Sequence, residues 1–177
     1  MALTVGTNVG FVTTAPTADP AGTAVTSDGS SFVVKDTSPA RALIIKEIGW
    51  YKASGSTSSN FQVGLYAANG ATVPGEAGTR LYVSSDSASG TSAGWKVISD
   101  LNWAINGSTA YWIGVQQDAH TLSSQIDSAT SGGAGIDTRT SQTALANPYG
   151  GGALSDADGM YAIYALYEIR PTMKWQQ

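Results

Sequence analysis

Alternation of apolar and polar residues constrains the fold of this chain more than any other feature of its sequence. The clearest example runs from Gly94 to Gln117, where short aromatic and β-branched segments are joined by an Asn106-Gly107 turn. Trp, Tyr, Ile and Val suit a pleated, half-buried surface, and Asn-Gly tolerates the positive φ of a tight hairpin. The pattern therefore predicts antiparallel β-strands.

The same period of two recurs along the chain, while no segment has the 3.6-residue period of an amphipathic helix. Clusters of Gly, Ser, Asn, Asp or Pro interrupt the apolar residues about every ten positions. Eight strands are typical of a jelly roll, so we expect an all-β chain folded as an antiparallel, jelly-roll-like β-sandwich. The strands are predicted at residues 10–14, 31–36, 41–52, 60–67, 79–84, 95–105, 110–117 and 160–170.

Alternation also predicts which side chains face the core. In the segment 60–67, Phe61, Val63 and Leu65 share one face of the strand, so they should point inward. Gln62 and Gly64 should face outward.

The length and two irregular regions bound the domain organisation. The 177 residues, 42% of them hydrophobic, allow one domain with a core, so residues 1–177 are expected to form a single jelly-roll domain. Pro16 and Pro20 favour extended backbone, and residues 1–30 are predicted to form an extended N-terminal arm. Residues 118–158 are rich in Gly, Ser and Thr and are predicted to be a long loop region. Both regions are candidates for contacts with other subunits.

Composition narrows the classes of partner and site. Only 12% of the residues are charged, so the surface should be built of hydroxyl and amide groups. A net charge of −4 with nine scattered Lys and Arg argues against a nucleic-acid partner. Without cysteine there is no disulfide and no thiolate metal site. The sequence shows no secretory signal and no run of ~20 apolar residues, so we expect cytoplasmic synthesis and no membrane partner.

Two sequence features resemble catalytic groups. Gly90-Thr-Ser92-Ala-Gly94 matches the G-x-S-x-G nucleophile elbow, but Ser92 precedes a predicted strand instead of a helix, which favours a simple loop. His120, the single histidine, lies next to a strand end beside Asp118, where a polar loop residue is the more common role than a triad base. We therefore expect no catalytic residue, no enzyme activity and no cofactor.

Carboxylates give two further candidates. Asp156 and Asp158, followed by a glycine, are a fragment of a calcium loop that lacks the third ligand and the closing Glu, and they favour a turn before the last strand over an ion site. The glutamates Glu47, Glu76 and Glu168 could contribute to a glycan hydrolase only if two carboxyl groups faced each other across a cleft, since that spacing is spatial. No metal site is therefore expected.

Aromatic residues carry the main alternative to a purely structural protein. The five tryptophans, together with the eight tyrosines, could form a flat platform on which sugar rings stack, as in carbohydrate-binding modules. Most of them lie in apolar segments, where a position in the core is the common outcome. An exposed coplanar row would favour the binding module. The tryptophans are Trp50, Trp95, Trp103, Trp112 and Trp175.

Turn and core motifs spread over nearly the whole chain carry a family resemblance. They are Gly10-Phe11, Thr14-Ala-Pro-Thr-Ala-Asp-Pro20, Lys35-Asp-Thr-Ser-Pro39, Ile48-Gly-Trp50, Val63-Gly-Leu-Tyr66, Gly94-Trp-Lys96, Tyr111-Trp-Ile-Gly-Val-Gln116, Thr140-Ser-Gln-Thr143, Asn147-Pro148 and Ala162-Ile-Tyr164. With these motifs the chain resembles a set of β-sandwich proteins of tailed phages and environmental sequences.

The resemblance implies a non-enzymatic structural protein of a phage virion. The expected role is capsid decoration, or cement, which stabilises the head by binding the major capsid protein, and the expected assembly is a homotrimer. A carbohydrate-binding module or the receptor-binding part of a tail fibre, with a glycan as partner, is the alternative. Under the decoration reading, deletion of the first twenty residues should weaken attachment to the particle and leave the sandwich folded.

Overall fold

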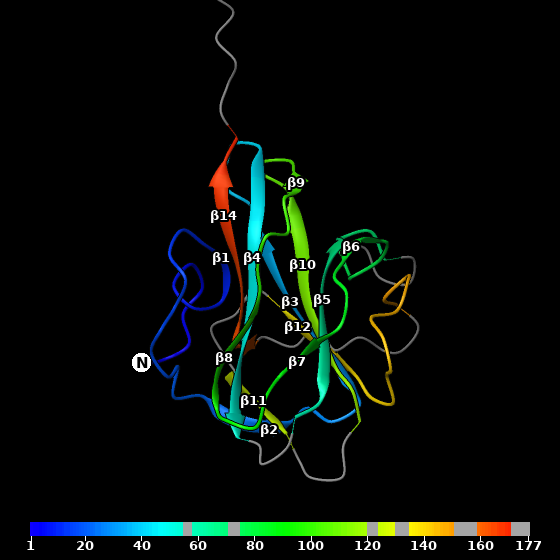
Figure 1. Ribbon diagram of the computed structural model, residues 1–177. Coiled ribbons are helices and arrows are strands. Elements are labelled where there is room, and N and C mark those ends of the chain that lie inside the picture. Colours follow the sequence, from blue (N-terminus) through cyan, green and yellow to red (C-terminus); the bar gives the residue numbers. More distant parts are fainter. Residues whose placement is uncertain (55–57, 71–74, 120–123, 130–134, 151–158, 171–177) are drawn as a thin grey trace, which may run out of the picture.

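Fourteen β-strands and no helix make up the part of the chain that the computed structural model describes, residues 1–54, 58–70, 75–119, 124–129, 135–150 and 159–170. The strands form two sheets that pack face to face (Figure 1). All pairs of named strands are antiparallel except one. The predicted all-β class and two-sheet sandwich are confirmed.

The eight-stranded sheet is organised around β4 (Leu43–Ser54), its longest strand. β14 (Ile163–Ile169) pairs antiparallel with β4, and β1 (Gly10–Val12) lies parallel to β14 with Phe11 opposite Ala165. The remaining strands of this sheet are β2 (Thr23–Thr26), β8 (Gly94–Ile98), β9 (Trp103–Ile105), β11 (Gln125–Ala129) and β13 (Met160–Tyr161).

The six-stranded sheet is centred on β10 (Ala110–Gln117), which is flanked by β3 (Ser30–Thr37) and β5 (Asn60–Ala67). The outer strands are β6 (Arg80–Val83), β7 (Ser87–Ala88) and β12 (Ile136–Arg139). The strand order is β12-β3-β10-β5-β6, and β7 pairs with the first two residues of β5.

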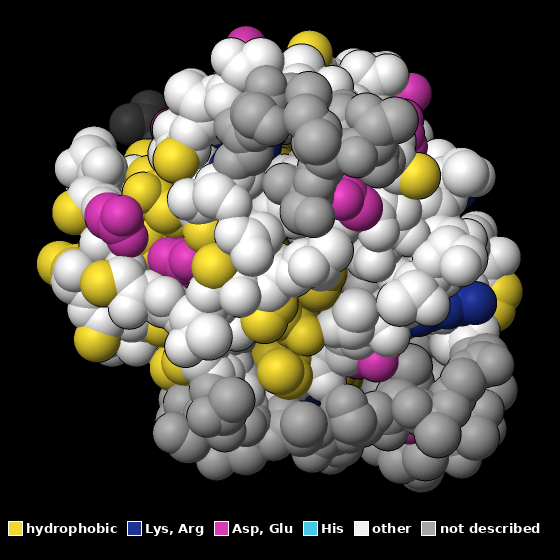
Figure 2. Space-filling view, turned by 90° about the horizontal axis from the view of Figure 1, so that it is seen from below, with side chains coloured by type: hydrophobic (Ala, Val, Ile, Leu, Met, Phe, Trp, Pro, Cys, Tyr) yellow, Lys and Arg dark blue, Asp and Glu magenta, His cyan; other side chains and the backbone are white. Residues whose placement is uncertain are grey.

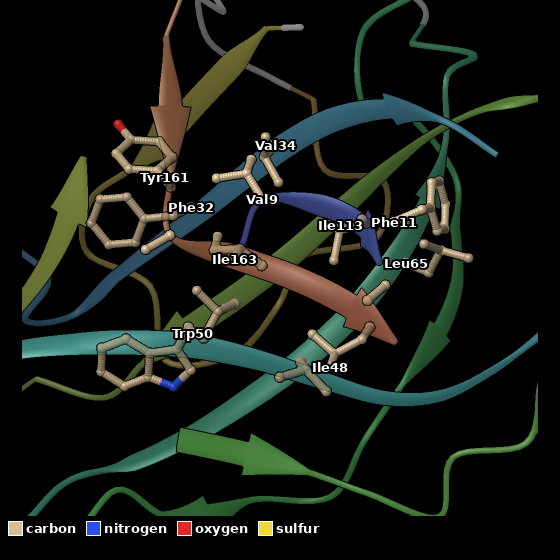
Figure 3. Close-up of a cluster of buried hydrophobic side chains, with 14 of the residues drawn as sticks. Val9, Phe11, Phe32, Val34, Ile48, Trp50, Leu65, Ile113, Tyr161 and Ile163 are labelled. Carbon is tan, nitrogen blue, oxygen red and sulfur yellow. The ribbon is translucent and has the colours of Figure 1, made fainter. Parts of the chain in front are cut away.

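The main core fills the space between the two sheets (Figure 3). Phe61, Val63 and Leu65 of β5 point into it, as their alternation predicts. Trp50 of β4 packs edge-on against Phe61, and Phe32 of β3 packs edge-on against a tyrosine of β13. Each buried aromatic side chain contributes on the order of 2–3 kcal/mol by leaving water, so this layer holds the sheets together.

A second, smaller core covers the outer face of the six-stranded sheet. Gly64 and Gly114 lie in register on neighbouring strands and leave space for the side chain of Leu145, whose Cδ1 would be 2.7 Å from a Cβ at position 64. Residues 140–150 therefore lie across this face, and the face that Gln62 and Gly64 occupy is covered instead of open. The cluster consists of Val33, Tyr66, Ala77, Trp112, Leu145 and Tyr149.

The predicted N-terminal arm is not formed. Residues 1–30 contain β1 and β2 of the eight-stranded sheet, and Leu3, Val9 and Phe11 are buried in the main core. Asn8 holds this segment in a tight turn, since its Oδ1 accepts a 2.7 Å hydrogen bond from the backbone N–H of Thr4. Deletion of the first twenty residues would remove core side chains, so it should destabilise the sandwich instead of leaving it folded.

The predicted loop region 118–158 and the strand count also differ from the structure. The region contains β11 and β12, which pair with β2, β3 and β4. The segment predicted as one strand at 95–105 is two strands, because Asp100 and Asn102 take the left-handed conformation at φ 59° and 52°. Short, polar and interrupted strands therefore account for the difference between eight and fourteen.

Candidate binding surface

An open groove of about 500 Å³ lies where the borders of the two sheets approach each other. One wall is formed by residues 83–87, from the last residue of β6 to the first residue of β7 in the six-stranded sheet. The other wall is formed by residues 97–101, which are the end of β8 and the turn that leads to β9 in the eight-stranded sheet, and Trp103 completes the lining. The groove therefore exists because the two sheets are not joined to each other along this side of the sandwich.

The turn between β8 and β9 sets the shape of the second wall. Asp and Asn tolerate left-handed backbone better than other non-glycine residues, which explains Asp100 and Asn102 at these positions. The side chain of Asn102 donates a 3.3 Å hydrogen bond to the backbone oxygen of Asp100 and accepts one from Lys46 Nζ. These bonds hold the backbone of the turn, so Asp100 lies at the rim of the groove.

Two stacked aromatic rings support the floor of the groove. The rings of Tyr82 and Trp103 are 5.2 Å apart and nearly parallel, at 9°. The Tyr82 hydroxyl donates a 2.9 Å hydrogen bond to the backbone oxygen of Ala104, so the pair links the two sheets at their borders. Because Trp103 is only 9% exposed, its ring supports the groove and does not offer a platform for a sugar.

The chemistry of the groove is a mixture of carboxylate, hydroxyl and apolar groups. Asp86 and Asp100 are exposed, one on each wall, beside the exposed side chains of Val83 (38%) and Val97 (43%). Such a surface can bind a polypeptide edge or a neutral, hydroxyl-rich ligand. The serines of the lining are Ser84, Ser85, Ser87 and Ser99.

Strand β6 borders the groove with a free edge. Ser84 donates its backbone N–H to Val63 of β5 at 2.9 Å, so the alternating hydrogen bonds of the ladder direct the N–H and C=O of Val83 away from β5. No strand of the described residues pairs with this side of β6, but the backbone N–H of Arg80 donates to Asn147 Oδ1 at 3.1 Å, so the free stretch of the edge lies around Val83. Leu81 on the same strand is 43% exposed, so the edge is both unpaired and apolar.

The tryptophans are mainly structural. Trp50 and Trp112 are buried, and Trp112 donates its indole N–H to the backbone oxygen of Gly75 at 2.9 Å. Trp95 is half-buried between Tyr51 and Tyr164. Over the described part of the chain, the aromatic side chains do not form an exposed coplanar row.

The sequence motifs that resemble catalytic groups are not assembled into a site. Ser92 is exposed in a bend and is followed by β8, so the strand–turn–helix geometry of a nucleophile elbow is missing. His120, Asp156, Asp158 and Trp175 lie outside the described residues.

One buried carboxyl group was not found by sequence reasoning. Asp137 on β12 is 3% exposed, its Oδ1 accepts a 2.6 Å hydrogen bond from the backbone N–H of Thr138, and its Oδ2 has no partner. Burial raises the pKa of Asp137 to about 6, and the nearby charge of buried Glu76 acts in the same direction. Segments far apart in the sequence bring the two carboxyl groups together, so no local pattern marks them. Tyr149 covers this face, and Asp137 does not line the groove described above, which favours a structural role.

The remaining glutamates are separated from this pair. Glu47 accepts a hydrogen bond from the hydroxyl of Tyr164, and Glu168 lies exposed near the end of β14. No two glutamates therefore line the groove.

A lysine and a serine meet inside the molecule. Lys52 on β4 donates from Nζ to Ser89 Oγ at 3.2 Å and to the backbone oxygen of Gly90 at 2.6 Å. Burial lowers the pKa of Lys52, and such an amine can activate a serine. Ser89 is only 2% exposed, however, so the contact anchors the loop before β8 and is not open to a substrate.

Among the described residues, no group of three or more His, Cys, Asp or Glu could hold a metal ion. None of them belongs to a helix long and apolar enough to cross a membrane. No protein-family model matches the sequence, and no curated protein or solved structure matches the chain.

Proposed function

We propose that this chain is a non-enzymatic structural protein of a phage virion, a jelly-roll sandwich that decorates the head by binding the major capsid protein and copies of itself. The observation that carries the proposal is the free border beside the groove, where Val83, Val97 and Leu81 are exposed. The resemblance of the turn and core motifs to those of phage proteins suggests a protein of the virion. The exposed apolar residues beside the groove form a surface suited to a protein partner.

A free, apolar strand edge is unfavourable in a protein that acts alone, because it can pair with other chains. In a decoration protein the same edge is covered in the assembled particle, by the capsid or by another copy of the chain. The low charge of the chain supports this use, since contacts between uncharged groups are little affected by salt. Figure 2 shows one end of the molecule, where Lys and Arg are sparse and most of the described surface is polar but uncharged.

Co-sedimentation with capsids that lack this protein tests the proposal. Val97→Lys places a charge on the β8 side of the groove and should reduce the affinity for the capsid by on the order of tenfold or more, a loss of about 1.4 kcal/mol. Ile169→Lys is the matched control, because Ile169 is 51% exposed at the end of β14, away from the groove. Wild-type protein that stays in the supernatant would overturn the proposal.

A second candidate function is glycan binding, as a carbohydrate-binding module or a receptor-binding part of a tail fibre. It is favoured by the serine hydroxyls and by the two carboxylates, Asp86 and Asp100, that line the groove. Both carboxylates are exposed, whereas a glycosidase keeps its acid in a shielded site, so the groove suits binding better than cleavage. Binding on a glycan array that is lost in Asp100→Ala and retained in Ile169→Lys would support this function over the first.

A further inference from the structure

The free edge of β6 has the layout of a surface that can pair with itself. Val83 is the last residue of β6, and its N–H and C=O are directed away from β5. Arg80 lies three residues before Val83, and Asp86 lies three residues after it. One end of the edge is therefore basic, the other is acidic, and the centre is apolar.

We propose that two copies of this chain pair antiparallel through β6, with Val83 opposite the partner's Val83 on a two-fold axis. Each copy then donates its Val83 N–H to the Val83 carbonyl of the other, as in a hydrogen-bonded antiparallel pair. The register of β6 is irregular between Tyr82 and Arg80, so the backbone pairing is confined to the stretch around Val83. Beyond that stretch, the side chain of Arg80 in each copy lies at the end where the partner's Asp86 lies, twice by symmetry.

The charges of Arg80 and Asp86 favour a second copy of this chain as the partner that binds the edge of β6. A segment with a basic and an acidic end complements itself in the antiparallel direction, whereas a parallel pairing in register would bring like charges together and a shifted register would move the opposite charges apart. Arg80 donates from one guanidinium nitrogen to the backbone oxygen of Leu145, but the group has five N–H donors, so it can also bind the partner's Asp86.

The pairing also joins the two sandwiches into one continuous sheet. β6 lies at the border of the six-stranded sheet (Figure 1), so the dimer would contain twelve strands across the contact, six from each copy. The exposed Leu81 and Val83 would lose contact with water there. This two-fold contact replaces the three-fold contact that the family resemblance implies.

Size-exclusion chromatography with light scattering tests the pairing. Wild-type protein should have twice the chain mass of 18.2 kDa. Asp86→Lys and Arg80→Glu should each weaken dimerisation by on the order of tenfold or more, because each places like charges opposite one another. Ile169→Lys is the matched control and should remain dimeric.

Mixing the two charge variants gives the decisive result. In a mixed dimer, Arg80 of the first copy meets the partner's Asp86, and the two introduced charges attract each other, so the equimolar mixture should recover the dimer. Circular dichroism of each variant alone checks that it is folded. Failure of the mixture of folded variants to associate would overturn the pairing, as would a wild-type monomer or trimer.

The proposed pairing rests on the proposed function only because both treat the edge of β6 as a docking surface. The dimer and the virion role can each fail without the other. A wild-type monomer that sediments with capsids would overturn the pairing alone. A wild-type dimer that ignores capsids would overturn the virion role alone.

Discussion

Replacement of Asp137 by Asn should stabilise this protein at neutral pH. The carboxyl group is buried against the second core, and only one of its two oxygens has a hydrogen-bond partner. An Asn side chain can keep the bond from the Thr138 N–H through its own oxygen while removing the charge. The perturbation therefore isolates the cost of burying an ionised carboxylate.

The size of the effect follows from the pKa of Asp137, which burial raises from 3.8 to about 6. Because the native-state pKa lies above the unfolded-state value, this carboxyl stabilises the native state fully below pH 3.8, and the contribution is lost as the pH rises through about 6. At about 1.4 kcal/mol per pH unit, the loss is about 3 kcal/mol. Asp137→Asn should therefore raise the free energy of unfolding by about 3 kcal/mol near pH 8 and by less than about 1 kcal/mol near pH 4.

Urea unfolding followed by tryptophan fluorescence, at both pH values, measures this difference. Other carboxyls whose pKa is raised by burial, such as Asp36 and Asp127, are present in both proteins and cancel in the comparison. Asp100→Asn is the control, since that side chain is exposed and Asn tolerates its left-handed backbone, and it should change the free energy of unfolding by less than about 0.5 kcal/mol. An equal gain at both pH values, or a loss near pH 8, would refute the argument.

Three substitutions test other parts of the structure. Phe11→Ala should lower the free energy of unfolding, measured in urea, by about 3–5 kcal/mol, because Phe11 packs edge-on against two tyrosines. A loss below about 1 kcal/mol would show that the N-terminal segment does not contribute to the core. Tyr149→Phe should cost roughly 1 kcal/mol, since the hydroxyl donates to the backbone oxygen of Ser31 at 3.2 Å, and unchanged hydrogen exchange across residues 140–150 would contradict this role. Gly49→Ala should cost about 1–3 kcal/mol and lower the midpoint of thermal unfolding, because the new Cβ would lie 2.5 Å from Tyr164 Cε1; an unchanged midpoint would contradict this close packing.

Strands with one apolar face could be predicted from the sequence. The predicted segments 60–67 and 110–117 coincide with β5 and β10 at both ends. Their alternating side chains pack between the sheets, so the local pattern and the tertiary structure favour the same conformation.

Strands defined by their neighbours could not be predicted. β2, β11 and β12 consist mainly of polar residues, and Ile126 of β11 is their one apolar side chain with no exposed surface. They are strands because they pair with other strands, which supply hydrogen bonds that a local pattern does not reveal. Tertiary context also breaks the last predicted strand at Ala162, whose backbone N–H bonds to β11 while the next residues pair with β4.

The candidate surface lay beyond sequence reasoning for the same reason. Asp86 and Asp100 occur in segments rich in serine and are unremarkable alone. They line one groove because β6 and β8 are the borders of facing sheets. Spatial proximity of this kind depends on the topology of the sheets. Ser92 is the opposite case, because its local sequence matches a nucleophile elbow but a strand follows it instead of a helix.

The parallel pairing of β1 with β14 has a mechanical consequence. Tension applied through the two ends of the described chain would pull β1 and β14 in opposite directions along their length, so the hydrogen bonds between them would be loaded together in shear instead of opening one at a time. The first strand of the sandwich is thus bonded to its last, and a pull on the two ends has to break the bonds between β1 and β14 together.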